Sequence, residues 1–143
     1  MEISKSSRKA GILLVLIAVL GAAILAMDQV LWQSMGGTHA YALIAFVIVD
    51  LVIAILLLTR PSKMSLTIAA VWSILRILLQ IADVYNGPTM SLSYADFANY
   101  LFNPTLVTAP NPPGVPAALI DAIIILQLIV IVVALTGRSA SQK

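Results

Sequence analysis

Four long apolar stretches, separated by polar connections, dominate the pattern of this chain. They cover residues 11–32, 41–59, 65–84 and 117–136. Each is about 20 residues long, the length that an α-helix needs to cross a hydrocarbon core about 30 Å thick. Because open strands would leave backbone groups unpaired in lipid, we expect helices. The pattern therefore predicts an all-α integral membrane protein with four transmembrane helices in a single membrane domain, residues 1–143.

The connection at residues 85–116 is the longest and is rich in proline. Within it, apolar positions recur at helical spacing after a residue suited to capping a helix: Ser93, then Tyr94, Phe97, Ala98 and Leu101. We expect a short amphipathic helix in this outer loop between the third and fourth spans. It would lie along the outer membrane surface or over the bundle, as an interfacial anchor or as a functional lid.

The basic residues predict how the chain is oriented. They precede the first span, join the second to the third and follow the fourth: Lys5, Arg8, Lys9, Arg60, Lys63, Arg138 and Lys143. The connections at residues 33–40 and 85–116 contain no Lys or Arg. By the positive-inside rule, both termini are expected in the cytoplasm and the protein in the cell membrane. The basic start also resembles a signal peptide, but we expect the first span to be retained.

The residue composition excludes several kinds of functional site. Charged residues make up 10% of the chain, against roughly 25% in soluble domains, and the spans leave no room for a separate soluble domain. Cysteine is absent and His39 is the only histidine, which excludes disulfides, thiolate ligands and a bis-histidine haem within one chain. Phosphate-binding glycine loops and hydrolase motifs are also missing. We expect no metal, no cofactor, no catalytic residue and no nucleic-acid partner.

Arg76 lies near the middle of the third span, where a charge costs roughly 3 kcal/mol on insertion scales. With Gln80 and Asp83 it follows i, i+4, i+7 spacing, so the three share one helix face. Asp50 lies at a similar depth in the second span, at about 1.5 Å per residue, and is the predicted ion-pair partner. Gln127 is as far before Thr136 as Asp50 is before Thr59, as in a weak internal repeat.

These positions predict an intramembrane polar network formed by Asp50, Arg76, Gln80, Asp83 and Gln127. One interpretation is an ion pair that fixes the register of the helices. The other is a transport or catalytic role. Removal of one partner alone should be more damaging than removal of both, because it leaves an uncompensated buried charge.

Three acids are expected about 10 Å further out than Arg76: Asp28, Asp83 and Asp121. Gathered at one depth, this outer-half acidic group would carry protons or bind a cation from outside. Each acid also has a simpler interpretation. The helix dipole favours Asp121 near the start of the fourth helix, Asp28 is hydrated near the headgroups, and Asp83 reaches back to Arg76.

Ala18, Ala22 and Ala26 repeat at every fourth position of the first span. Such small-xxx-small spacing lets helices approach closely. The stripe predicts helix packing, either within the bundle or against a neighbouring chain.

The function expected from these features is that of a small non-catalytic accessory subunit of a larger membrane complex, such as a respiratory or other energy-converting assembly. Its partners would be the lipid bilayer and other membrane subunits or further copies of itself. The alternative is a small oligomeric transporter or channel, linked to protons or cations through the intramembrane Asp and Arg residues. A membrane enzyme, or a binder of quinone, lipid or pigment, is the third possibility.

Overall fold

The chain is all-helical in its computed structural model, which describes residues 2–28, 31–32, 37–86 and 114–139. Four helices account for nearly all of these: α1 (Glu2–Met27), α3 (Thr38–Thr59), α4 (Lys63–Asn86) and α6 (Gly114–Ser139). Each is long and apolar enough to cross a membrane, over Ile3–Met27, Thr38–Thr59, Lys63–Gln80 and Ala118–Ser139. The predicted all-α class with four candidate membrane helices is confirmed. The helix predicted within residues 85–116 lies outside the described residues.

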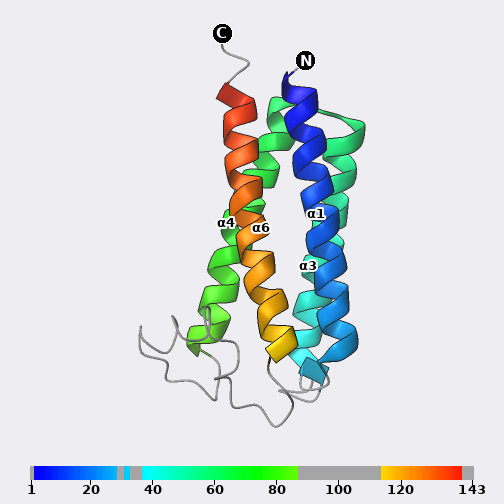
Figure 1. The fold of residues 1–143 in the computed structure, drawn as a ribbon, viewed down its shortest axis with the longest axis vertical. Helices are drawn as coiled ribbons and strands as arrows, with labels where there is room; N and C mark the ends of the chain where they lie inside the picture. The colour runs from blue at the N-terminus through cyan, green and yellow to red at the C-terminus, as the bar shows by residue number, and fades with distance from the viewer. Residues whose placement is uncertain (1, 29–30, 33–36, 87–113, 140–143) are drawn as a thin grey trace.

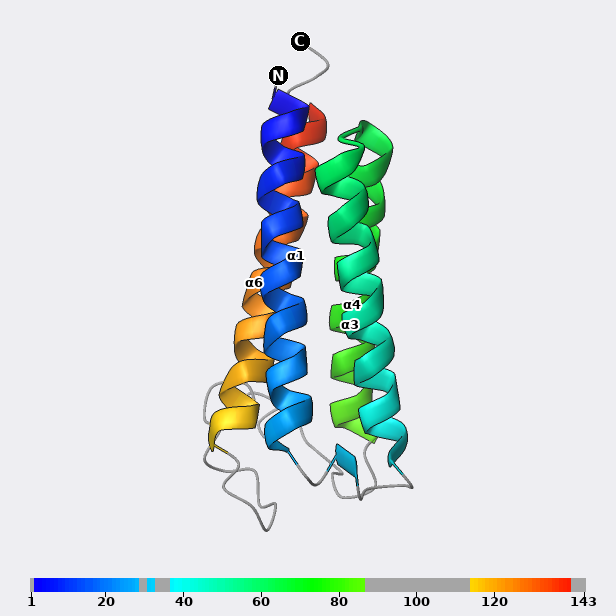
Figure 2. The ribbon, with the colours of Figure 1, turned by 90° about the vertical axis from the view of Figure 1, so that its right-hand side faces the viewer.

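The four helices run side by side along one axis and alternate in direction (Figure 1). Helix α1 packs closely against α3 and α6, and α4 packs against α6. In Figure 2, α1 and α6 lie on one side of the bundle and α3 and α4 on the other. The backbones of α3 and α4 approach each other at fewer positions. The space between these two helices is therefore available to large side chains.

One end of the bundle, which we call the basic end, is where α1 begins, α3 meets α4 and α6 ends (Figure 1). Apart from Arg76, every described Lys and Arg lies there and is exposed: Lys5, Arg8, Lys9, Arg60, Lys63 and Arg138. Apart from Arg76, the cationic side chains of α1, α4 and α6 and of the connection between α3 and α4 thus lie at one end.

The helix ends differ from the boundaries predicted for the apolar stretches. Helix α1 already begins at Glu2 and ends at Met27, before the predicted end at residue 32. The apolar stretch marks only the part suited to lipid, whereas the lysines and arginines before it are good helix formers in water as well. Helix α6 begins at Gly114 and holds Pro116 in its first turn, where the missing N–H has no helical partner to lose.

Two local features set the starts of α4 and α3. The backbone N–H of Ser65 donates to Ser62 Oγ over 3.0 Å, and the N–H of Ser62 donates to Ser65 Oγ over 2.9 Å. This reciprocal cap satisfies two groups that the helix itself leaves unpaired. Gly37 precedes α3 with φ of 81°, a left-handed conformation that glycine adopts without a steric cost.

The interior is mostly apolar and holds polar side chains near the middle of the bundle. Between the basic end and the bundle centre, the buried residues are almost all small or aliphatic: Ala10, Leu14, Ala54, Leu57, Leu66, Ala69, Ala70, Val130 and Ala134. Near the centre, Asp50, Ser73, Arg76 and Gln127 are buried. Large apolar side chains are exposed on all four helices, including Ile12, Val52, Leu78 and Ile125. An apolar outer surface, with the buried charges kept inside, is the arrangement expected for a bundle surrounded by lipid.

Candidate functional site

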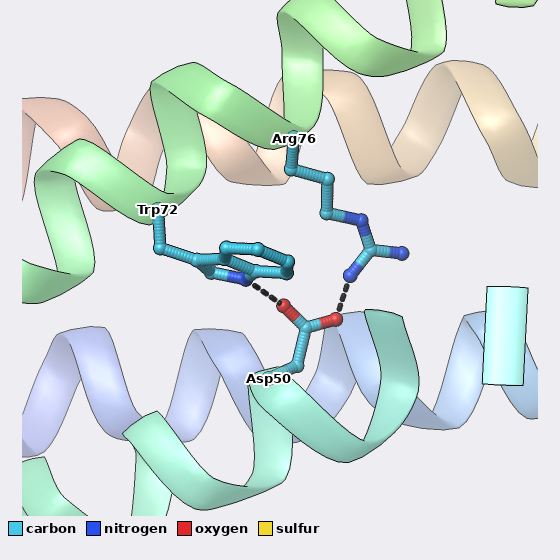
Figure 3. A network of polar contacts seen from close by, with 3 residues as sticks. All are labelled: Asp50, Trp72 and Arg76. Carbon is cyan, nitrogen blue, oxygen red and sulfur yellow. Dashed lines mark hydrogen bonds and ion pairs between the residues drawn. The ribbon is translucent and has the colours of Figure 1, made fainter. Parts of the chain in front are cut away.

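Asp50 of α3 and Arg76 of α4 face each other in the space between their helices. Arg76 Nη1 contacts Asp50 Oδ2 as an ion pair, and both side chains are 0% exposed (Figure 3). A carboxylate and a guanidinium removed from water lose hydration, and their mutual attraction offsets that loss only when the remaining polar groups are also bonded. The stability of the pair therefore depends on whether neighbouring side chains bond its remaining polar atoms.

Trp72 completes the coordination of the carboxylate. Its Nε1–H donates to Asp50 Oδ1 over 2.7 Å, so each oxygen of Asp50 has a partner from α4 (Figure 3). A hydrogen bond to a charged acceptor is shorter and stronger than one between neutral groups. Asp50 is thus held from two sides by one neighbouring helix.

Phe46 and Trp72 enclose the pair with aromatic rings. The guanidinium carbon of Arg76 lies 5.4 Å from the centre of the Phe46 ring, within the range of a cation–π interaction. The Phe46 and Trp72 ring centres are 5.8 Å apart at 74°, an edge-to-face contact. The rings add charge stabilisation and fill the gap between α3 and α4.

The sequence places these four side chains together through one repeated spacing. Phe46 stands four residues before Asp50, and Trp72 stands four residues before Arg76. Residues four apart share a helix face. Because α3 and α4 are antiparallel, the aromatic residue of each helix meets the charged residue of the other. Neither Phe46 nor Trp72 was predicted as part of the site, because the spacing shows only that each shares a helix face with its charged neighbour.

Helix α1 approaches the pair at Gly21. A Cβ placed on Gly21 would lie 2.7 Å from Val47 Cγ2 and 3.9 Å from Arg76 Nη2. The lack of a side chain therefore lets α1 pack against α3 and leaves room for the guanidinium. Gly21 was also missed, since a single glycine in an apolar stretch carries no sign of what it faces.

Gln127 and Gln80 are the remaining described members of the predicted polar network. Gln127 on α6 is 0% exposed, and neither of its amide atoms has a hydrogen-bond partner among the described residues. Gln80 is partly buried, and its Oε1 is likewise without a partner in that part of the chain. The side chain of Asp83 lies outside the described part. The structure thus brings Asp50 and Arg76 into contact, with no bond from either glutamine to the pair.

The outer-half acids are described in part. Asp28 follows the last residue of α1, and its N–H donates to the Ile24 carbonyl over 2.8 Å. Asp121 lies about two turns into α6, half-buried, with an unpartnered Oδ1. Within the described residues, no three His, Cys, Asp or Glu side chains gather closely enough to hold a metal ion.

The alanine stripe divides between two environments. Ala18 is buried, whereas Ala22 and Ala26 are exposed on the outer surface of α1. The small residues that pack inside the bundle are instead Ser7, Ala10, Gly11, Ala18 and Gly21. Ala22 and Ala26 remain free to contact lipid or another chain.

Comparison with known proteins gives no match to a protein family, a curated protein or a solved structure. A buried, doubly held carboxylate beside an arginine is suited to fixing two helices in one register.

Proposed function

We propose that this protein is a small non-catalytic accessory subunit of a larger membrane complex, such as a respiratory or other energy-converting assembly. The observation that carries the proposal is the saturation of Asp50 within the chain by Arg76 and Trp72, at 0% exposure. A carboxylate that serves transport has to exchange its partners for the transported ion. One held on both oxygens and enclosed by aromatic rings is better suited to holding helices together.

The proposed orientation places the basic end in the cytoplasm and the opposite end outside, with the protein in the cell membrane. It is supported by the exposed cations that gather at the basic end and by the positive-inside rule. The apolar outer surface, which includes Ala22 and Ala26 on α1, would then face lipid and the neighbouring subunits. Self-association is the alternative use of the same surface.

The test is isolation of the tagged protein from its own host in a mild detergent, followed by sizing and mass spectrometry. The expected result is stoichiometric recovery with larger membrane subunits that carry the redox or transport machinery. A homogeneous assembly of this chain alone would contradict the accessory role. An untagged strain processed in parallel controls for proteins that bind the resin.

A proton- or cation-linked transporter is the second candidate, and one observation favours it. Several buried polar atoms remain unpartnered among the described residues, including Arg76 Nη2, both amide atoms of Gln127 and Asp121 Oδ1. Groups of this kind are found along ion pathways. Proton or cation flux into vesicles that contain the purified chain, abolished by Asp50→Asn, would support this function over the first.

A further inference from the structure

Two close contacts mark the line along which α1 meets α3, which we call the α1–α3 seam. A Cβ on Gly11 would lie 2.9 Å from Leu58 Cγ, and one on Gly21 would lie 2.7 Å from Val47 Cγ2. The two glycines are ten residues apart, so the contacts are separated by about 15 Å along the helix. One leaflet of a hydrocarbon core about 30 Å thick has the same depth. The seam is therefore as long as an acyl chain of one leaflet.

Two arginines flank this seam where it reaches the basic end. Arg8 lies three residues before Gly11, and Arg60 lies two residues after Leu58. Both residues therefore lie about 3–4.5 Å beyond that contact, toward the basic end. Both side chains are exposed, and neither forms an ion pair with another described residue. The seam thus ends at two cationic side chains of similar depth, one from each side.

Exposed apolar side chains continue from the arginines along the seam. On α1, Ile12, Val15 and Val19 follow Arg8 at i+4, i+7 and i+11, so all four share one helix face. The three apolar side chains are 55%, 37% and 58% exposed. On α3, exposed residues at spacings of three and four lead from the seam contact toward the bundle centre: Leu58, Ile55, Leu51 and Ile48. The surface beside the seam is therefore cationic at the basic end and apolar from there to the centre.

This order of charge and apolar surface fits one phospholipid molecule. A guanidinium donates two parallel hydrogen bonds to a phosphate group, and a second guanidinium at the same depth adds to the attraction. Two adjacent cations favour a headgroup with a net negative charge over a zwitterionic one, whose own ammonium group they would repel. Acyl chains add apolar contact along the seam, which a free phosphate cannot provide.

We propose that the α1–α3 seam binds an anionic phospholipid. Arg8 and Arg60 hold the phosphate of its headgroup, and the exposed apolar residues beside the seam contact its acyl chains. The proposal goes beyond the accessory role, because it concerns lipid bound to the chain itself and holds whichever subunits surround the bundle.

The test is native mass spectrometry of the full chain in a nonionic detergent, titrated with phosphatidylglycerol or with phosphatidylcholine of the same acyl chains. Arg8→Gln/Arg60→Gln removes both charges beside the seam. The control is Lys5→Gln/Arg138→Gln, which removes two exposed charges from the same end, beside the contact of α1 with Gly137 of α6. Each variant is first checked for the elution volume and the melting temperature of the wild type.

The wild type is expected to bind phosphatidylglycerol at least about tenfold more tightly than phosphatidylcholine, since each cation near an anionic headgroup is worth about fivefold in affinity. Arg8→Gln/Arg60→Gln should therefore weaken binding of phosphatidylglycerol about 25-fold. The control should weaken it less than about threefold, because salt screens charges that lie further away than about 10 Å.

Three results would overturn the proposal. Equal binding of the two lipids by the wild type would remove the selectivity for an anionic headgroup, and this comparison needs no variant. Equal losses in the two double variants would show a general attraction to the basic end in place of a site at the seam. Displacement of the bound lipid by millimolar glycerol 3-phosphate would show that the acyl chains contribute nothing.

Discussion

At the residue scale, Asp50 organises the site through the different partners of its two oxygens. Arg76 neutralises one, and the Trp72 indole N–H bonds the other. Neither helix would tolerate its own charged side chain at the bundle centre without the other. The pair is thus a condition for placing α3 beside α4.

Trp72→Phe removes the hydrogen bond to Asp50 while keeping an aromatic ring against Phe46. We expect a loss of about 1.5–3 kcal/mol in the free energy of unfolding, because the lost bond is made to a charged acceptor. Thermal melting of the purified protein in detergent measures the change.

Trp32→Phe is the matched control, since Trp32 Nε1 also donates one hydrogen bond, over 2.9 Å to the Leu25 carbonyl. That bond is exposed and its acceptor is neutral, so this substitution should cost less. Equal melting temperatures for Trp72→Phe and the wild type would show that the bond to Asp50 contributes nothing.

The sequence predicted Asp50 and Arg76 as partners because a charge near mid-membrane has few alternatives. The depth of a residue in a membrane helix follows from the number of residues that separate it from the helix end. The two residues could therefore be placed at similar depths from the sequence alone. The orientation of neighbouring side chains depends on how the helices turn about their axes. That rotation follows from packing at positions such as Gly21, and hence Phe46 and Trp72 could not be assigned as a shell around the pair.

At the element scale, α1 is fitted to its neighbours by its small residues. Gly11 faces Leu58 and Gly21 faces Val47, at distances that leave no space for a side chain. Close approach of this kind compensates for the weak hydrophobic drive between helices in lipid. It explains why α1 packs tightly on α3 while α3 and α4 stand further apart.

Gly21→Leu should therefore destabilise the bundle by about 1–3 kcal/mol or more, through overpacking against Val47 and displacement of the Arg76 guanidinium. Ala22→Leu introduces the same side chain one residue away, on the exposed surface of α1. It should change stability by no more than about 0.5 kcal/mol. Melting temperatures of the two variants in the same detergent decide the matter, and a Gly21→Leu protein as stable as Ala22→Leu would contradict this packing.

The helices themselves were predictable, but their ends were not. Long apolar stretches bounded by basic residues are a strong signal for membrane helices. Local capping sets the helix ends, as at Ser62 and Ser65. The extent of the apolar stretch also does not show that α1 begins at Glu2 and includes Lys5, Arg8 and Lys9.

At the scale of the whole molecule, the bundle combines an apolar outer surface, a mostly apolar interior and a polar centre. Composition predicted the first of these. Which face of each helix is buried could not be predicted, because the exposed face is largely as apolar as the buried one, and hydrophobicity alone does not distinguish them. Gln127 is an example: its depth could be predicted from the sequence, but the absence of a hydrogen bond to Asp50 or Arg76 could not.

We propose that Asp50 and Arg76 hold the bundle together and take no part in chemistry. The most direct test is isolation from the host of three tagged variants: Arg76→Leu, Asp50→Leu and the double substitution. Each single variant should lose folded yield, since one buried charge is left unpaired, at a cost of about 3–5 kcal/mol. The double variant should recover part of that yield and co-purify with the same membrane subunits as the wild type. A double variant no better folded than the singles, or one that folds but loses its partner subunits, would contradict the claim.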